Sequence, residues 1–312
     1  MPVFQAGMRS CYNTQKGDCI LKAVRFSDFS DFLFLLPSML LLSVFVFYPF
    51  IVGAVYSFSD WNGMFITKWI GFANYIRLAQ DINVRAAFQN TLMYGIVVPI
   101  VLLPLGMLLA NILHSRVLRF NGIFRTVIYL PVTISLLIVA NLFNIILVYE
   151  GLLDQIWQTV GHEKGLNVMA SIPHMRIAML LIMMWCSLGV CVVFLLAGLQ
   201  GISKEIFEAA YVDGANAVNC FFRITLPMMR PTIMIVTFII MNSMLKTFDL
   251  PYKLTNGGPG YATLSIAQLI YNQAFKNFTM GYTTTTGIFL LILVSILAYL
   301  QMRITGGRED VQ

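Results

Sequence analysis

The stretch that decides the fold lies between two arginines. From Arg85 to Arg116 the chain reads AAFQNTLMYGIVVPIVLLPLGMLLANILHS, which is 30 residues without Asp, Glu, Lys or Arg. A helix of about 20 apolar residues is long enough to cross the roughly 30 Å hydrocarbon core of a bilayer. The stretch therefore predicts a transmembrane helix. Its two prolines do not argue against this, because neighbouring helices in a membrane bundle re-satisfy the freed backbone groups.

The whole chain shares this composition. Of its 312 residues 58% are hydrophobic and only 11% are charged, whereas a soluble domain usually carries about 25% charged residues. This excludes an ordinary soluble enzyme, a disordered chain and a disulfide scaffold. The gaps between charges predict an all-α polytopic membrane protein with a short segment at 1–31, a transmembrane domain at 32–303 and a tail at 304–312. Its six helices are expected at roughly 32–58, 90–113, 126–148, 178–200, 228–248 and 281–302.

The basic residues indicate the orientation. Twelve of the 20 Lys and Arg residues fall in the segments on one side of the predicted membrane, and eight fall on the other. Cytoplasmic loops carry the excess of Lys and Arg, so we expect both termini in the cytoplasm. The net charge of +6 then reflects topology, and we expect membrane lipid and no nucleic acid as a partner. We do not expect the first apolar stretch to be a signal peptide, because the polar segment that precedes it is too long.

Sequence motifs for catalysis are missing. The chain holds no P-loop, no H-E-x-x-H and no G-x-S-x-G, so we expect no enzyme activity, no cofactor and no metal site. An ion-coupled carrier usually holds Asp, Glu or His within its spans. Apart from cysteine and tyrosine, Lys246 is the one ionisable side chain at span depth. If the protein transports a solute uphill, the energy must come from a partner.

The loop after the fourth predicted span has an unusual pattern. Ser203 is a plausible N-cap, followed by Glu205 near the positive end of a helix. Gly214 can end that helix in a left-handed conformation. One face of the helix would carry four residues at helical spacing, namely Phe207, Ala210, Tyr211 and Gly214. The pattern predicts a helix–turn–helix fit for docking, and the alternative is an amphipathic loop packed on its own bundle.

The spacing in this loop resembles the EAA motif of ABC-importer permeases. Glu208-Ala209-Ala210 is followed at family spacing by Gly214 and then by Ile224-x-Leu226-Pro227. Ser203 departs from the proline that the family often has there. The resemblance implies that residues 203–227 form a coupling loop that seats in a cytoplasmic ATPase. The residues expected to couple to the ATPase are Glu205, Glu208, Ala209, Ala210, Asp213 and Gly214.

Further segments narrow the resemblance. They are Ile70–Tyr75, Asn90-Thr91, Leu196–Gln200 and Thr255–Gly260 with Thr263 and Tyr271. Together they are similar to the first of the two permeases of maltose- and glycerol-3-phosphate-type importers, over residues 35–303. This implies a type I ABC-importer permease fold (MetI-like) in a bacterial cytoplasmic membrane. It also implies alternating access of a sugar or oligosaccharide, a second permease subunit in a heterodimer, an ABC ATPase dimer and an extracytoplasmic sugar-binding protein.

Polar residues inside the spans are the candidates for sugar contact, because a sugar needs hydrogen-bond groups and an apolar or aromatic face. Each of them is equally suited to a hydrogen bond between helices. Lys246 would attract an acidic substrate or extend toward the membrane interface. The candidates are Asn141, Asn144, Trp185 as a stacking partner, Ser187, and a cluster in the fifth span formed by Asn242, Ser243, Lys246 and Thr247.

Two other classes of protein stay open at this point. One is a stand-alone secondary carrier or channel whose loop matches the motif by chance, and the other is a membrane enzyme. The EAA spacing and the lack of carboxylates within the spans argue against the first, and the missing catalytic motifs against the second. The sequence does not identify the sugar.

Overall fold

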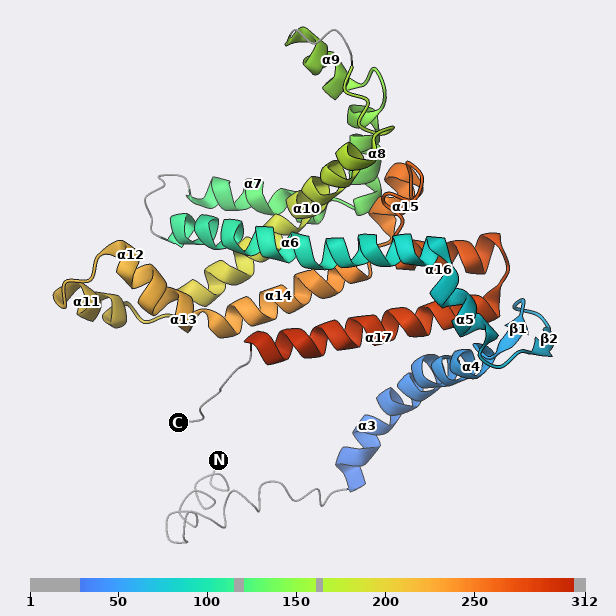
Figure 1. Ribbon diagram of the computed structural model, residues 1–312. Helices are drawn as coiled ribbons and strands as arrows, with labels where there is room; N and C mark the ends of the chain where they lie inside the picture. The colour runs from blue at the N-terminus through green and yellow to red at the C-terminus, as the bar shows by residue number, and fades with distance from the viewer. Residues whose placement is uncertain (1–28, 115–120, 161–164, 306–312) are drawn as a thin grey trace. The chain divides into compact units, whose positions relative to one another are not determined.

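The computed structural model describes residues 29–114, 121–160 and 165–305, and most of these are helical (Figure 1). The chain divides after Val55 into two units. In the first unit α3 (Phe29–Leu42), the π-helical turn η1 (Ser43–Phe47) and α4 (Tyr48–Tyr56) follow one another without a break. The stretch Leu35–Tyr56 is long and apolar enough to cross a membrane, which confirms a first span here.

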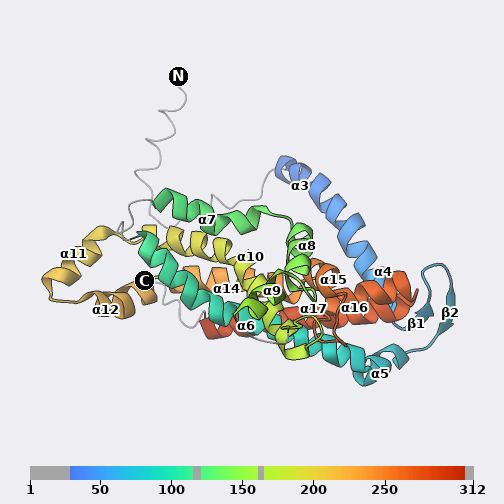
Figure 2. The same cartoon turned by 90° about the horizontal axis from the view of Figure 1, so that it is seen from above.

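The core of the second unit lies among α6 (Ile82–His114), α10 (Ile172–Gln200) and α14 (Arg230–Leu245). Figures 1 and 2 show these three helices running alongside one another. They bury large apolar side chains such as Leu102, Met179 and Leu195, each almost fully shielded from solvent. A last long helix, α17 (Met280–Thr305), packs against α14.

Glycines let the helices approach closely. A Cβ added at Gly95 would lie 2.5 Å from the side chain of Leu245, and one added at Gly106 would lie 2.6 Å from the sulfur of Cys191. At Gly189 the added atom would meet the backbone of α7 (Asn121–Thr133), 2.8 Å from the carbonyl oxygen of Ile128. Small residues at such contacts are typical of packing between membrane helices.

The third predicted span is wrong as a single helix over 126–148. Helix α7 stops at Thr133, and α8 (Leu136–Leu147) begins after an extended Ser135. Pro131 removes a backbone donor near the end of α7, and the Thr133 hydroxyl donates to the carbonyl oxygen of Leu130 at 2.8 Å. The apolar stretch that is long enough to span runs instead from Leu136 to Thr159, through α9 (Leu152–Thr159).

The fifth predicted span is shorter and bent. The chain passes through α12 (Ala217–Cys220), η2 (Phe221–Thr225) and α13 (Leu226–Met228), then bends by 66° into α14. Helix α14 ends at Leu245, so the expected end at 248 is wrong by three residues. Within the described residues five helices can cross a membrane, or six if the bent pair counts as one span. The all-α class is confirmed, with these changes of boundary.

A small β-hairpin with a short helix beside it was not expected from the sequence. Strands β1 (Ser59–Trp61) and β2 (Ile66–Trp69) pair antiparallel, with Ser59 opposite Trp69. The side-chain amide of Asn74, in α5 (Ala73–Gln80), donates to the carbonyl oxygens of Ser57 at 2.9 Å and Ser59 at 3.0 Å. The same end of the second unit carries α15 (Asp249–Thr255), α16 (Ile266–Tyr271) and η3 (Asn272–Lys276). We refer to it as the hairpin end, and to the opposite end, with α11 (Lys204–Val212), as the α11 end.

Candidate functional site

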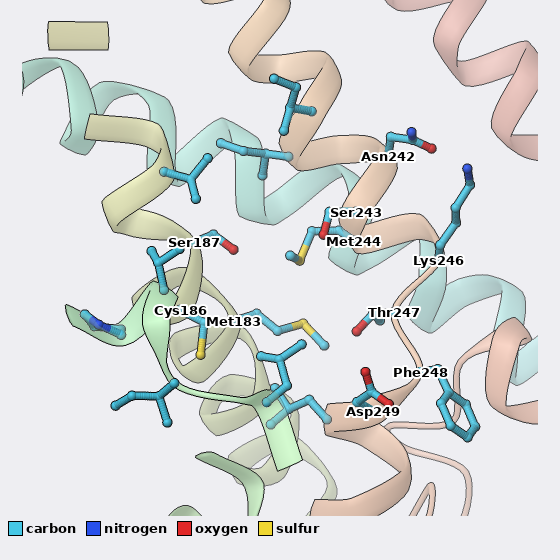
Figure 3. Close-up of a pocket in the computed structure, with 18 of the residues that line it drawn as sticks. Met183, Cys186, Ser187, Asn242, Ser243, Met244, Lys246, Thr247, Phe248 and Asp249 are labelled. Carbon is cyan, nitrogen blue, oxygen red and sulfur yellow. The ribbon is translucent and has the colours of Figure 1, made fainter. Parts of the chain in front are cut away.

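A cavity of about 640 Å³ lies between three parts of the second unit (Figure 3). One wall is the break between α7 and α8, the second is a face of α10, and the third is the end of α14 with the start of α15. Most lining residues are apolar. The polar residues and the lysine that line it are Ser187, Asn242, Ser243, Lys246, Thr247 and Asp249.

Helix periodicity and a helix break bring these side chains together. Met183, Cys186, Ser187 and Val190 are spaced i, i+3, i+4 and i+7 along α10, so they share the face that lines the cavity. On the opposite wall α14 stops at Leu245, and the non-helical residues 246–248 bring new side chains to the space. A ligand-sized space with a mostly apolar lining and a few polar groups is the usual form of a small-molecule site.

The polar groups do not all face the same way. In Figure 3 the hydroxyls of Ser187, Ser243 and Thr247 and the carboxylate of Asp249 point into the space between α10 and α14. The side chain of Lys246 extends away from it, as does the amide of Asn242. The cluster predicted in the fifth span is therefore assembled on one wall, with only part of it directed inward.

Three predicted contacts lie outside the cavity. Trp185 is two residues from Ser187, which places it on the other side of α10, and its ring packs edge-on against Phe143 at 5.7 Å. The expected stacking role of Trp185 in the cavity is therefore not supported. Asn144 donates its side-chain amide to the carbonyl oxygen of Leu254 at 3.2 Å, which ties α8 to α15. Asn141 is exposed on α8 and does not line the cavity.

Asp249 was not predicted from the sequence. It lies one residue beyond the predicted end of the fifth span, in the first turn of α15, and lines the cavity. It is also the only acidic residue between Asp213 and Glu309, and that isolation was the signal available. A carboxylate thus stands on the cavity wall, so the scarcity of acidic residues no longer counts against a self-powered carrier.

The 203–227 loop has the local structure that its sequence predicts. The Ser203 hydroxyl accepts from the backbone N–H of Glu205 at 3.3 Å and caps α11. At the other end Gly214 has φ +80°. The N–H of Ala215 donates to the carbonyl of Ala210 at 2.9 Å, and that of Gly214 to Tyr211 at 3.0 Å. These two bonds form a Schellman motif, in which glycine closes the helix.

The surface of this loop is open. Figures 1 and 2 show α11 and α12 projecting beyond the other helices of the second unit. The side chain of Val212 is 88% exposed, and Tyr211 is exposed beside it. Ala209 is exposed whereas Ala210 is buried, so the small pair does not present a single surface. The carboxylates of Glu205, Glu208 and Asp213 are exposed, which gives the loop an acidic and apolar surface.

Comparison with known proteins identifies the chain. Residues 102–308 match the family model described as binding-protein-dependent transport system inner membrane component. The chain belongs to this family. The lactose transport system permease protein LacF of Rhizobium radiobacter is 30% identical to this chain, and the match covers 91% of this chain and 97% of LacF. The multiple sugar-binding transport system permease protein MsmF of Streptococcus mutans is also 30% identical, and that match covers 88% of this chain and 95% of MsmF.

Other relatives and solved structures agree. The arabinooligosaccharides transport system permease protein AraP of Bacillus subtilis is 31% identical, with 89% of each chain covered. A chain of a bacterial ABC transporter involved in the import of the acidic polysaccharide alginate has the same fold, with a TM-score of 0.78 at 23% identity over 93% of this permease and 99% of that chain. This protein is therefore a multi-pass membrane permease of an ABC importer. It is a transport subunit rather than an enzyme, and the ATP is hydrolysed by a separate ATPase.

Proposed function

We propose that this permease moves a sugar or oligosaccharide across the cytoplasmic membrane by alternating access through the cavity between α10 and α14. One observation carries the proposal: both of these walls run directly into the 203–227 loop. Helix α10 ends at Gln200, three residues before Ser203, and α14 begins at Arg230, three residues after Pro227. Movement of the loop would therefore act on both sides of the cavity.

The cavity has the chemistry that a sugar requires. Inward-facing hydroxyls of Ser187, Ser243 and Thr247 supply donors and acceptors, and apolar side chains make up most of the remaining lining. Three relatives carry names that refer to lactose, multiple sugars and arabinooligosaccharides. The carboxylate of Asp249 faces the cavity while Lys246 extends away, so this wall favours a neutral sugar over an acidic one.

The 203–227 loop is proposed as the contact with the ATPase. The loop projects from the bundle, and its acidic residues and exposed Val212 and Tyr211 suit a partner with a complementary basic and apolar cleft. Of the predicted coupling residues, the exposed ones are the proposed contacts, namely Glu205, Glu208, Ala209, Asp213 and Gly214, whereas the buried Ala210 would hold α11 in place. Closure of an ATPase dimer would pull this loop and, through α10 and α14, reorient the cavity walls.

The complete importer would contain further subunits. A second permease would cover the open side of the cavity in a heterodimer, and an extracytoplasmic binding protein would deliver the sugar. A solved alginate transporter of the same fold is complexed with a pentasaccharide-bound periplasmic protein. The excess of basic residues in the segments at 1–31, 114–125, 201–230 and 303–312 supports an orientation with both termini in the cytoplasm.

Removing one cavity hydroxyl tests the sugar site. Thr247→Ala is expected to raise the half-saturating sugar concentration for uptake by up to about tenfold, since one hydrogen bond contributes about 0.5–1.5 kcal/mol. Asn242→Ala should have a smaller effect, because its amide extends away from the cavity. Thr237→Ala is the matched control, since that hydroxyl donates to the carbonyl of Ile233 at 2.6 Å within the same helix. Uptake competition with a panel of sugars gives the apparent affinities, and unchanged values in both cavity variants would remove the site.

A pull-down tests the ATPase contact. The tagged permease, solubilised from cells that express the whole importer, is expected to retain the ATPase subunit. Glu208→Lys reverses a charge on the exposed loop and should reduce the retained ATPase about tenfold at low salt. Asp60→Lys, at an exposed residue of β1 at the hairpin end, should leave it unchanged. Equal retention by all three proteins would contradict the proposed docking surface.

A further inference from the structure

A short segment at the hairpin end is held by side chains of two helices. The amide nitrogen of Asn90 donates to the carbonyl oxygens of Tyr261 at 2.7 Å and Leu264 at 3.0 Å. The hydroxyl of Tyr94 donates to the carbonyl of Thr263 at 3.1 Å. Asn90, Tyr94 and Thr263 are buried. These contacts from α6 satisfy backbone groups of residues 261–264 that lie outside any helix or strand.

The contact from α10 is made by a single arginine. Arg176 lies near the start of this helix and is half-buried. Its Nε donates to the carbonyl oxygen of Ala262 at 3.2 Å, and its Nη2 donates to Oδ1 of Asn90 at 3.3 Å. The guanidinium thus bridges α6 and the 261–264 segment with two differently placed donors. A lysine, with one nitrogen, would not reproduce this planar fork.

Arg176 connects α10 to the 261–264 segment, and both of these lead along the chain into walls of the cavity. Helix α10 supplies one wall through Met183, Ser187 and their neighbours. The 261–264 segment follows α15, whose first residues Asp249 and Leu250 line the other wall. Arg176 therefore ties α10 to the segment that follows α15 at the hairpin end, as the 203–227 loop connects α10 to α14 at the α11 end.

Helix α10 makes a direct connection between these ends. It is unbroken from Ile172 to Gln200, and Figures 1 and 2 show it crossing the bundle toward α11. At 1.5 Å per residue, Arg176 and the end of the helix are about 36 Å apart along its axis. An unbroken helix of this length transmits a displacement at one end to the other.

We infer that Arg176 is a positioning residue that makes the 261–264 segment follow the movement of α10. The cavity wall formed by the start of α15 would move with that segment. The inference rests on the proposed function, in which the ATPase moves the 203–227 loop. Arg176 touches neither the cavity nor the loop, so it acts through the backbone of Ala262 and the side chain of Asn90. Without this bridge α10 would move while the segment stayed with α6.

A cysteine at position 261 reports on the segment. The side chain of Tyr261 is 51% exposed, and its contact to Asn90 uses the backbone oxygen, so Tyr261→Cys keeps that bond. The complete importer carrying this substitution is placed in lipid nanodiscs and reacted with a maleimide, with and without MgATP and vanadate. The rate is measured by mass spectrometry on the peptide that contains residue 261, which separates it from the native cysteines. Arg176→Gln, Arg176→Lys and the control Arg85→Gln, an exposed arginine on α6, are each combined with it.

The nucleotide response decides the inference. In the parent protein the rate should change between the two states, and Arg176→Gln should reduce that change about tenfold, a size typical of coupling between sites. Arg176→Lys should restore part of it, and Arg85→Gln should match the parent. A full nucleotide response in Arg176→Gln would overturn the positioning role, even if the reaction were faster in both states.

The same experiment separates this inference from the proposed function. Basal ATPase activity of the parent complex is measured first, and its absence would contradict the ATPase coupling independently of Arg176. With that activity present, Arg176→Gln should keep the basal rate, since the residue is remote from the 203–227 loop. Loss of the basal rate together with the nucleotide response would overturn the inference, because it would show a general structural defect.

Discussion

Replacing Gly214 with valine is expected to abolish uptake while the permease still inserts into the membrane. Gly214 ends α11 with φ +80°, and a residue with a side chain pays about 1–2 kcal/mol in this conformation, more if it is β-branched. Within the described residues no heavy atom lies within 4 Å of an added Cβ. The effect would thus come from the conformation and surface of the 203–227 loop, and not from a clash within the permease. Uptake and ATPase retention are measured together with the amount of protein in the membrane.

Gly214→Asn is the matched control for conformation. Asparagine adopts the left-handed region more readily than other residues with a side chain, so the chain should still turn after Asp213. We expect this variant to keep a substantial part of the uptake. Near-normal uptake by Gly214→Val would refute the coupling role of the loop. Equal loss in both variants would show that bulk at the docking surface, rather than the turn, is responsible.

Replacing Gly189 with leucine is expected to prevent α7 and α10 from packing. Even one added carbon would lie 2.8 Å from the carbonyl oxygen of Ile128 and 3.0 Å from the Cα of Tyr129. These are backbone atoms, so the helices would have to move apart. Overpacking of a well-filled interior costs about 1–3 kcal/mol and occasionally more. The cost of leucine at position 189 should lie near the upper limit, because the atoms that obstruct it belong to the backbone. The detergent-solubilised importer should aggregate at a clearly lower temperature, as followed by size-exclusion chromatography after heating.

Gly287→Leu is the control for this prediction. Gly287 is half-buried in α17, and within the described residues no heavy atom lies within 4 Å of an added Cβ. A leucine there should leave the aggregation temperature close to that of the parent. If Gly189→Leu also behaved like the parent, the close contact between α7 and α10 would not be important for stability.

Much of the fold was predictable because the signals are local. The charge-free stretches locate the spans, since a bilayer excludes charges over a length that the sequence displays directly. The helix cap at Ser203 and the left-handed Gly214 were equally accessible, because capping depends on residues a few positions apart. The type of transporter was also predictable, because the EAA spacing lies within 20 consecutive residues of the 203–227 loop.

The tertiary structure decided what local patterns do not contain. The third span lies at 136–159 instead of the predicted 126–148, and α14 ends at Leu245. Both differences come from bends in the chain, which depend on competing contacts. Side-chain direction around α10 placed Ser187 in the cavity and Trp185 against Phe143, and the end of α14 brought Asp249 to the wall. The bridge from Arg176 to Ala262 joins residues 86 positions apart. The sequence by itself determined the multi-pass membrane class and the local structure of the 203–227 loop, because both depend on residues that are neighbours in the chain. Only the folded bundle decided which polar groups meet, because that depends on how distant helices pack.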